Sequence, residues 1–279
     1  MASLTWSVPV SEGYGRRMRF LVWDDSIGKL LGIIALGDPV FNLHARDNVI
    51  GWDVSTRTNK LVSVMDAYVL GALPPYSMLL GGKLVACLVR TTEVRDAFRA
   101  RYGESRGIIS KTYKQADLLA VTTSSALGRS SIYNRLSLGQ IAYFKPIGFT
   151  SGFGHFHVSP SLFEDLREYL AIRRHPYAQG NRFGNGPNWK FRAIRAALEL
   201  MNISRDYLRH GIKREVFLAT LAENSISVLQ GIDISPMFSD LQSVNVVSKL
   251  ARERWIVPRI QRRPEYKSWN RRQFLSLLQ

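Results

Sequence analysis

The chain has 279 residues, of which 46% are hydrophobic and 22% charged, and its formal net charge is +16. This composition is that of a globular protein, so disordered, collagen-like and low-complexity classes are excluded. A single cysteine, Cys87, excludes a disulfide framework and a cysteine-based zinc cluster. No apolar run approaches the roughly 18–20 residues that span a bilayer, so we expect a cytoplasmic protein that does not enter a membrane.

The first part of the chain predicts a sheet with short helices. Two apolar runs flank a loop that contains Asp and Gly, which indicates a β-hairpin. Residues 37–52 look irregular. In chain order, strands are expected at 18–23, 29–36, 60–71, 118–124, 140–149 and 153–158, and helices at 82–101 and 130–136. The expected fold is α+β, with a mixed, mostly antiparallel sheet flanked by helices.

Beyond residue 160 the pattern becomes helical. Helices are expected at 162–174, 188–202 and 204–228, because apolar residues such as Phe191, Ile194 and Leu198 recur on one helical face. We therefore expect two domains, an α+β domain at 1–160 and a basic, mainly helical region at 161–279.

Lys and Arg gather in two segments of the second half. Residues 167–214 contain eleven basic side chains against three acids, and residues 249–272 contain nine against two. Arginines interleaved with aromatics suit phosphate contact and base stacking. The alternative is an ordinary solvated surface whose aromatics belong to the core. The residues predicted to contact nucleic acid, DNA rather than RNA, are Arg182, Lys190, Arg192, Arg195, Lys213, Arg214, Arg259, Arg262 and Arg263.

The order of elements over roughly 15–160 resembles the core of the GNAT acyltransferases. The segment Leu79-Leu80-Gly81-Gly82-Lys83-Leu84 stands where that family has its pyrophosphate loop, although the leading Arg or Gln and the final small residue are missing. The resemblance implies that Gly81, Gly82 and Lys83 bind acetyl-CoA or a related acyl donor. It also implies that Tyr133 is a general acid; the alternative is a tyrosine packed beneath the sheet.

A second resemblance covers most of the chain. It is carried by the segments Arg46-Asp47-Asn-Val-Ile-Gly51-Trp52, Leu79–Leu84, Thr122–Asn134 and His210-Gly-Ile-Lys-Arg-Glu215. These segments, in this order, are similar to the DruA family, which occurs in the Druantia anti-phage systems. The resemblance implies defence against foreign DNA, together with a helicase or another subunit of such a system.

Three side chains are candidates for acid–base chemistry. Asp66 lies within an apolar strand, where a carboxylate must be paired or have a shifted pKa, so it is a candidate base. His155 and His157 are two residues apart in an expected strand and would share one face, as an acid–base pair or as metal ligands. The alternative is a polar strand face. Asp66 could instead hold Mg²⁺ with Asp38 and Asp47, unless Asp47 pairs with Arg46.

Three functions remain open at this point. The first is a nucleic-acid-binding subunit that uses the fold as a scaffold. The second is a GNAT-type transferase that modifies a nucleobase, in the manner of phage Mom proteins, with Asp66, Tyr133 and His155 as catalytic groups. The third is a metal-dependent nuclease. The charge and the incomplete loop favour the first.

Overall fold

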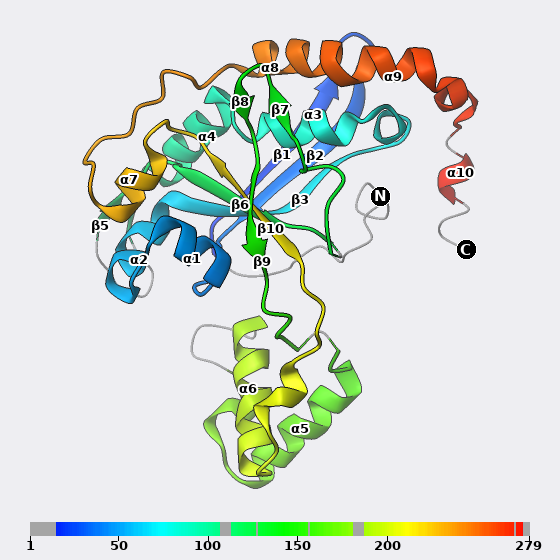
Figure 1. Cartoon of the computed structure of the whole chain (residues 1–279). Helices are drawn as coiled ribbons and strands as arrows, with labels where there is room; N and C mark the ends of the chain where they lie inside the picture. The colour runs from blue at the N-terminus through cyan, green and yellow to red at the C-terminus, as the bar shows by residue number, and fades with distance from the viewer. Residues whose placement is uncertain are drawn as a thin grey trace.

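The computed structural model describes residues 15–106, 113–126, 128–155, 157–180, 187–270 and 272–275. These residues form a mixed α+β protein built on one six-stranded sheet (Figure 1). The strands are β1 Arg17–Asp24, β2 Lys29–Gly37, β3 Val64–Ala72, β4 Glu104–Arg106, β5 Tyr113–Gln115, β6 Ala120–Ser124, β7 Ser137–Leu138, β8 Ile141–Ala142, β9 Lys145–Phe149 and β10 Glu215–Thr220. The helices are α1 His44–Ile50, α2 Val54–Lys60, α3 Gly81–Leu88, α4 Thr92–Tyr102, α5 Pro160–Ile172, α6 Pro187–Leu200, α7 Ser225–Gln230, α8 Val244–Ala251, α9 Val257–Arg262 and α10 Arg272–Leu275.

The large sheet has the strand order β1-β2-β3-β6-β10-β9. Neighbouring strands are antiparallel except for β3 and β6, which are parallel over Val64–Asp66 and Ala120–Thr122. The expected mixed, mostly antiparallel sheet is therefore confirmed. One row of paired residues crosses five strands and consists of Arg17, Gly37, Asp66, Thr122 and Leu218.

Alternation along the strands sends side chains into two different layers. Met65 and Phe217 point into a core that α3, α4 and α8 cover. Val64 and Leu218, next to them in sequence, point the opposite way, into a core with Ile50 of α1 and Leu229 of α7. Parts of the sheet are thus buried on both faces. No helix of the described ranges is long and apolar enough to cross a membrane.

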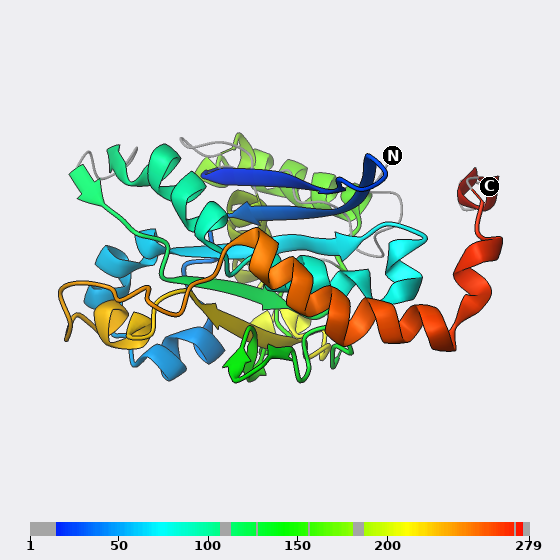
Figure 2. The same cartoon turned by 90° about the horizontal axis from the view of Figure 1, so that it is seen from above.

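A helical lobe is inserted between β9 and β10 (Figure 1). Its helices α5 and α6 share a core of their own, formed by buried residues from Val158 to Leu208. Ser159 caps α5 by accepting a hydrogen bond from the Leu162 N–H at 3.2 Å. Figure 2, seen from the side of α8 and α9, shows the lobe behind the sheet. The helices expected at 162–174 and 188–202 are confirmed.

Most of the expected strands and helices of the first part are confirmed, including the hairpin and the strand at 118–124. Three expectations are wrong. Residues 37–52 contain α1, residues 130–136 form turns, and the described residues of 153–158 contain no strand. In that last segment Phe153 makes only an isolated bridge to Arg209. Loops rich in Ser, Gly and His carry weak periodicity, so tertiary contacts decide their conformation.

The helix expected at 204–228 is also wrong, because this segment contains the interior strand β10. The run Val216–Ala219 is continuously apolar, and periodicity alone does not distinguish a buried strand from a buried helix. Pairing with β6 and β9 on either side makes it a strand. With α7 and α8, it packs into the sheet's cores although it lies beyond residue 160.

Candidate functional site

Asp66 occupies the centre of the sheet, on β3 beside the parallel strand β6. Its Oδ1 accepts a hydrogen bond from Thr122 Oγ1 at 2.6 Å. Burial raises the pKa of Asp66, while the Thr122 hydroxyl and the charges of Arg214, Arg46 and Arg17 act in the opposite direction. A carboxyl group that holds its proton to higher pH can take part in proton transfer, and the role of Asp66 as a base stays a prediction.

The raised pKa of Asp66 predicts an unusual pH dependence of stability. The folded pKa exceeds the unfolded value of about 4, so the contribution of neutral Asp66 is complete below that pH. It is lost as the pH rises through the folded pKa. We expect the free energy of unfolding of Asp66→Asn, which keeps an acceptor for Thr122, to exceed that of the wild type at pH 7 and to show no gain at low pH. Denaturant titrations across this range measure the difference, and a gain that is independent of pH would contradict the assignment.

The other two acids proposed for Mg²⁺ are held in ion pairs. Asp47 Oδ1 accepts from Arg46 Nη2 at 2.7 Å, and its Oδ2 accepts from Arg57 Nη1 at 2.9 Å. The alternative of a structural Arg46–Asp47 pair is therefore confirmed. Asp38 pairs with Arg16 at 2.6 Å. Across the described ranges, no three His, Cys, Asp or Glu side chains gather as a metal site would require.

Tyr133 is buried in the core on the α3 side of the sheet. Its ring packs against Phe144 and Phe217, with centroids 5.4 and 5.2 Å away. Burial raises the pKa of its hydroxyl, which lies within hydrogen-bonding reach of Thr123. Asp66 alternates with Met65 and therefore points to the opposite face. The sheet separates these two candidate catalytic groups.

His155 lies at the base of the helical lobe and not on the sheet. Its ring packs against Phe191 of α6 at 5.8 Å, and burial, with the charges of Lys190 and His157, lowers its pKa. His157 Nε2 bonds the Tyr207 carbonyl at 2.9 Å. Because no strand forms here, the two histidines do not share a strand face. The structure thus does not bring together Asp66, Tyr133 and His155.

Gly81, Gly82 and Lys83 open α3, as expected, but Gly81 is closed in by the chain itself. A Cβ on Gly81 would lie 2.7 Å from the Tyr76 carbonyl oxygen, and one on Gly82 would lie 3.6 Å from Ile132. The Lys83 ammonium lies over the Trp255 ring at 5.6 Å, and burial lowers its pKa. These residues do not form an open cradle for a pyrophosphate, so we derive no step through an acyl donor.

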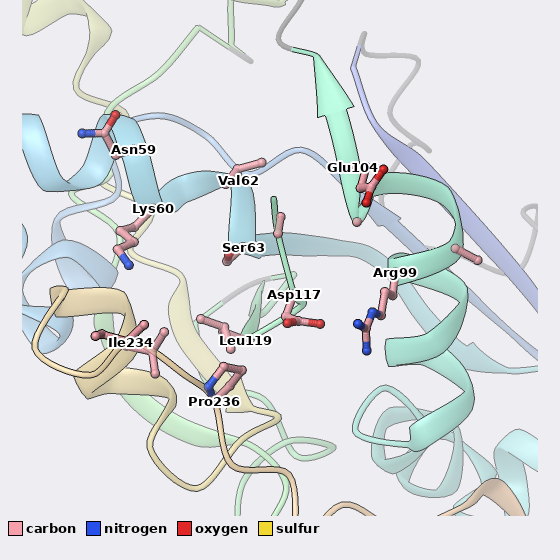
Figure 3. A pocket seen from close by; sticks show the side chains of 14 residues that line it. Asn59, Lys60, Val62, Ser63, Arg99, Glu104, Asp117, Leu119, Ile234 and Pro236 are labelled. Carbon is pink, nitrogen blue, oxygen red and sulfur yellow. The ribbon is translucent and has the colours of Figure 1, made fainter. Parts of the chain in front are cut away.

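A polar cavity of about 800 Å³ opens at the amino ends of β3 and β6 (Figure 3). Lys60 and Arg99 line it from opposite sides, Asp117 and Ser63 lie between them, and Ile234 lies at its edge. None of these residues was a candidate from the sequence, because they come from four segments far apart in the chain. Asp66 is the third residue of β3 and does not line the cavity.

The basic residues of the lobe differ in how far they are engaged. Arg192 and Lys213 are exposed, and no ion pair is found for either within the described residues. Lys190 and Arg195 lie over the rings of Phe163 and Phe191 at 4.8 and 5.9 Å. Arg214 donates from Nε to the Ser125 carbonyl at 2.6 Å. Arg182 lies outside the described residues.

The second basic cluster follows α8 and α9. The π-helical segment Arg252–Ile256 joins them into one long helix across the top of the sheet in Figure 1. Arg259 donates to the Met78 carbonyl, Arg262 to the Pro258 carbonyl, and Arg263 pairs with Glu265. The other basic side chains here are exposed, and no ion pair is found for them in this part of the structure: Lys249, Arg252 and Arg254.

The fold and these surfaces define a basic α+β protein with an inserted helical lobe and two exposed basic surfaces. The chain belongs to the DruA family, since the family model described as Druantia protein DruA matches residues 1–231. It is 54% identical over 278 residues to the Druantia protein DruA of Escherichia coli (strain UMEA 4076-1), covering 100% of this chain and 69% of that relative. Membership supports a role as a component of Druantia anti-phage defence. No solved structure matches the chain, so the likeness to GNAT enzymes stays a prediction.

Proposed function

We propose that this chain binds nucleic acid, DNA in the first place, as one subunit of a Druantia-type defence system. The observation that carries the proposal is the pair of exposed basic surfaces. The helix surface consists of Lys249, Arg252, Arg254 and Arg262, and the lobe surface of Arg192 and Lys213. Exposed cations that lie close together repel one another, and phosphates relieve this repulsion while condensed counterions are released. A helicase or another subunit of the system would act on the bound DNA.

The test is a binding titration with a labelled DNA duplex from about 50 to 200 mM salt. We expect the logarithm of the affinity to fall linearly with the logarithm of salt. The variant Arg252→Glu/Arg254→Glu/Arg262→Glu is expected to bind at least about tenfold more weakly and to reduce the salt slope by roughly 2–3, because each phosphate contact contributes roughly 0.9.

The control is Arg101→Glu, an exposed arginine on α4 away from α9 in Figure 1. This substitution reverses one positive charge, as each substitution of the triple variant does, but it lies outside both basic surfaces. We therefore expect its affinity for the duplex to be within about twofold of the wild type. Equal losses per reversed charge in the two variants would show a general effect of net charge. Absence of salt-dependent binding by the wild type would overturn the proposal.

A further inference from the structure

The edge strand β1 carries its exposed side chains on one face. Met18 and Phe20 pack into the core beneath α3 and α4. Residues between and beyond them point the opposite way, since a strand has a period of two. Leu21 is 58% exposed and Trp23 is 53% exposed. A large aromatic side chain is thus half exposed on an edge strand, next to the register shift between Val22 and Trp23.

Two arginines and a tyrosine meet on the same face. The Arg17 guanidinium lies over the Tyr68 ring at 4.6 Å, and Arg19 Nε donates to the Tyr68 hydroxyl at 3.4 Å. Gly37 of β2, which pairs with Arg17, leaves the room for this contact: a Cβ there would lie 2.8 Å from the Arg17 guanidinium and 3.3 Å from the Tyr68 ring. The contacts join β1 and β3 across the small residue on β2.

On this face Ala35 and Val69, which lie in one row with Arg19, are buried, whereas Leu21 and Trp23 of β1 are exposed. On this side α1 and α7 pack over β6 and β10, whereas β1–β3 have their helical layer on the other face. The lobe, with its own basic residues, lies on the side toward which this face looks (Figures 1 and 2). Asp66 lies in the same row as Arg17 and Gly37, at the inner border of the face.

We propose that this face of β1–β3 is a platform for single-stranded nucleic acid, with bases stacked on Trp23 and phosphates held by Arg17 and Arg19. The proposal rests on the proposed function and names its substrate class. Bases of a single strand are free to stack on an aromatic ring, and stacking tolerates any sequence because every base has a π-face. A duplex keeps its bases inside, so it cannot use Trp23 in this way.

The experiment compares Trp23→Ala with the wild type on three labelled probes of about 15 units: oligo-dT, oligo-rU and a DNA duplex. We expect Trp23→Ala to bind oligo-dT about 5- to 100-fold more weakly, with an unchanged salt slope. Duplex binding should stay within about twofold, and Trp23→Phe should retain most of the single-strand affinity. Comparison of oligo-dT with oligo-rU decides between DNA and RNA as the source of the strand.

The control is Ile232→Ala, which removes another exposed apolar side chain, in the loop after α7. It should leave all three affinities unchanged. If Trp23→Ala binds oligo-dT like the wild type while the duplex titration stays salt-dependent, the platform is wrong and the proposed function stands. If the wild type binds none of the probes, both fail. Thermal unfolding of each variant shows whether a loss comes from misfolding.

Discussion

Replacing Arg46 with Met is expected to lower the free energy of unfolding by about 3–5 kcal/mol. The side chain is fully buried. Its Nε and Nη2 donate to Asp47 Oδ1, and Nη1 and Nη2 donate to the carbonyls of Val40 and Phe41, each at 2.9 Å. Met fills similar volume but donates no hydrogen bond. The two carbonyls would lose their partners, and Asp47 would keep only one of its two cations, Arg57.

The expected fall in melting temperature is about 6–20 °C. The matched control is Arg205→Met, whose partner Glu199 is exposed, and which should cost less than about 1 kcal/mol. Equal effects of the two substitutions would contradict the burial of the Arg46 network.

The same substitution links the network to the candidate site. The Arg46 charge lowers the pKa of Asp66, so its removal should raise that pKa further. In Arg46→Met, the loss of unfolding free energy that accompanies deprotonation of Asp66 should therefore extend to higher pH. The buried Arg46 side chain thus affects the pKa of Asp66 at the centre of the sheet as well as the stability of the fold.

Replacing Gly32 with Ala is expected to cost about 3 kcal/mol. A Cβ at Gly32 would lie 2.5 Å from the Gly71 carbonyl oxygen and 2.6 Å from Val85 Cγ2. The first atom belongs to the backbone of β3 and the second to α3, so neither moves without displacing the strand or the helix. Urea titration measures the loss of unfolding free energy.

The control for this substitution is Gly82→Ala. There a Cβ would lie 3.6 Å from Ile132, an ordinary van der Waals contact, and alanine favours the helical conformation. We expect Gly82→Ala to be neutral or to stabilise by up to about 1 kcal/mol. If Gly32→Ala were equally harmless, α3 would not press on β2 as closely as the structure places it.

Local patterns in the sequence were enough for several features of this protein. The apolar runs around the Asp24–Gly28 turn determine the hairpin, and the helical spacing of apolar residues determines the helices of the lobe. The surplus of Lys and Arg follows from composition. The sequence segments between Arg46 and Glu215 were sufficient to predict membership of the DruA family, which the comparisons with known proteins confirm.

Only the tertiary structure decided which side chains meet. Strand register places Asp66 in one row with Arg17 and Thr122. Strand alternation places Asp66 on one face of the sheet, whereas Tyr133 packs against the other face. The alternation of Arg17, Arg19, Leu21 and Trp23 was present in the sequence, but which face stays uncovered was not. Periodicity describes one segment at a time, whereas a site depends on pairing between segments tens of residues apart, and on which faces the helices cover.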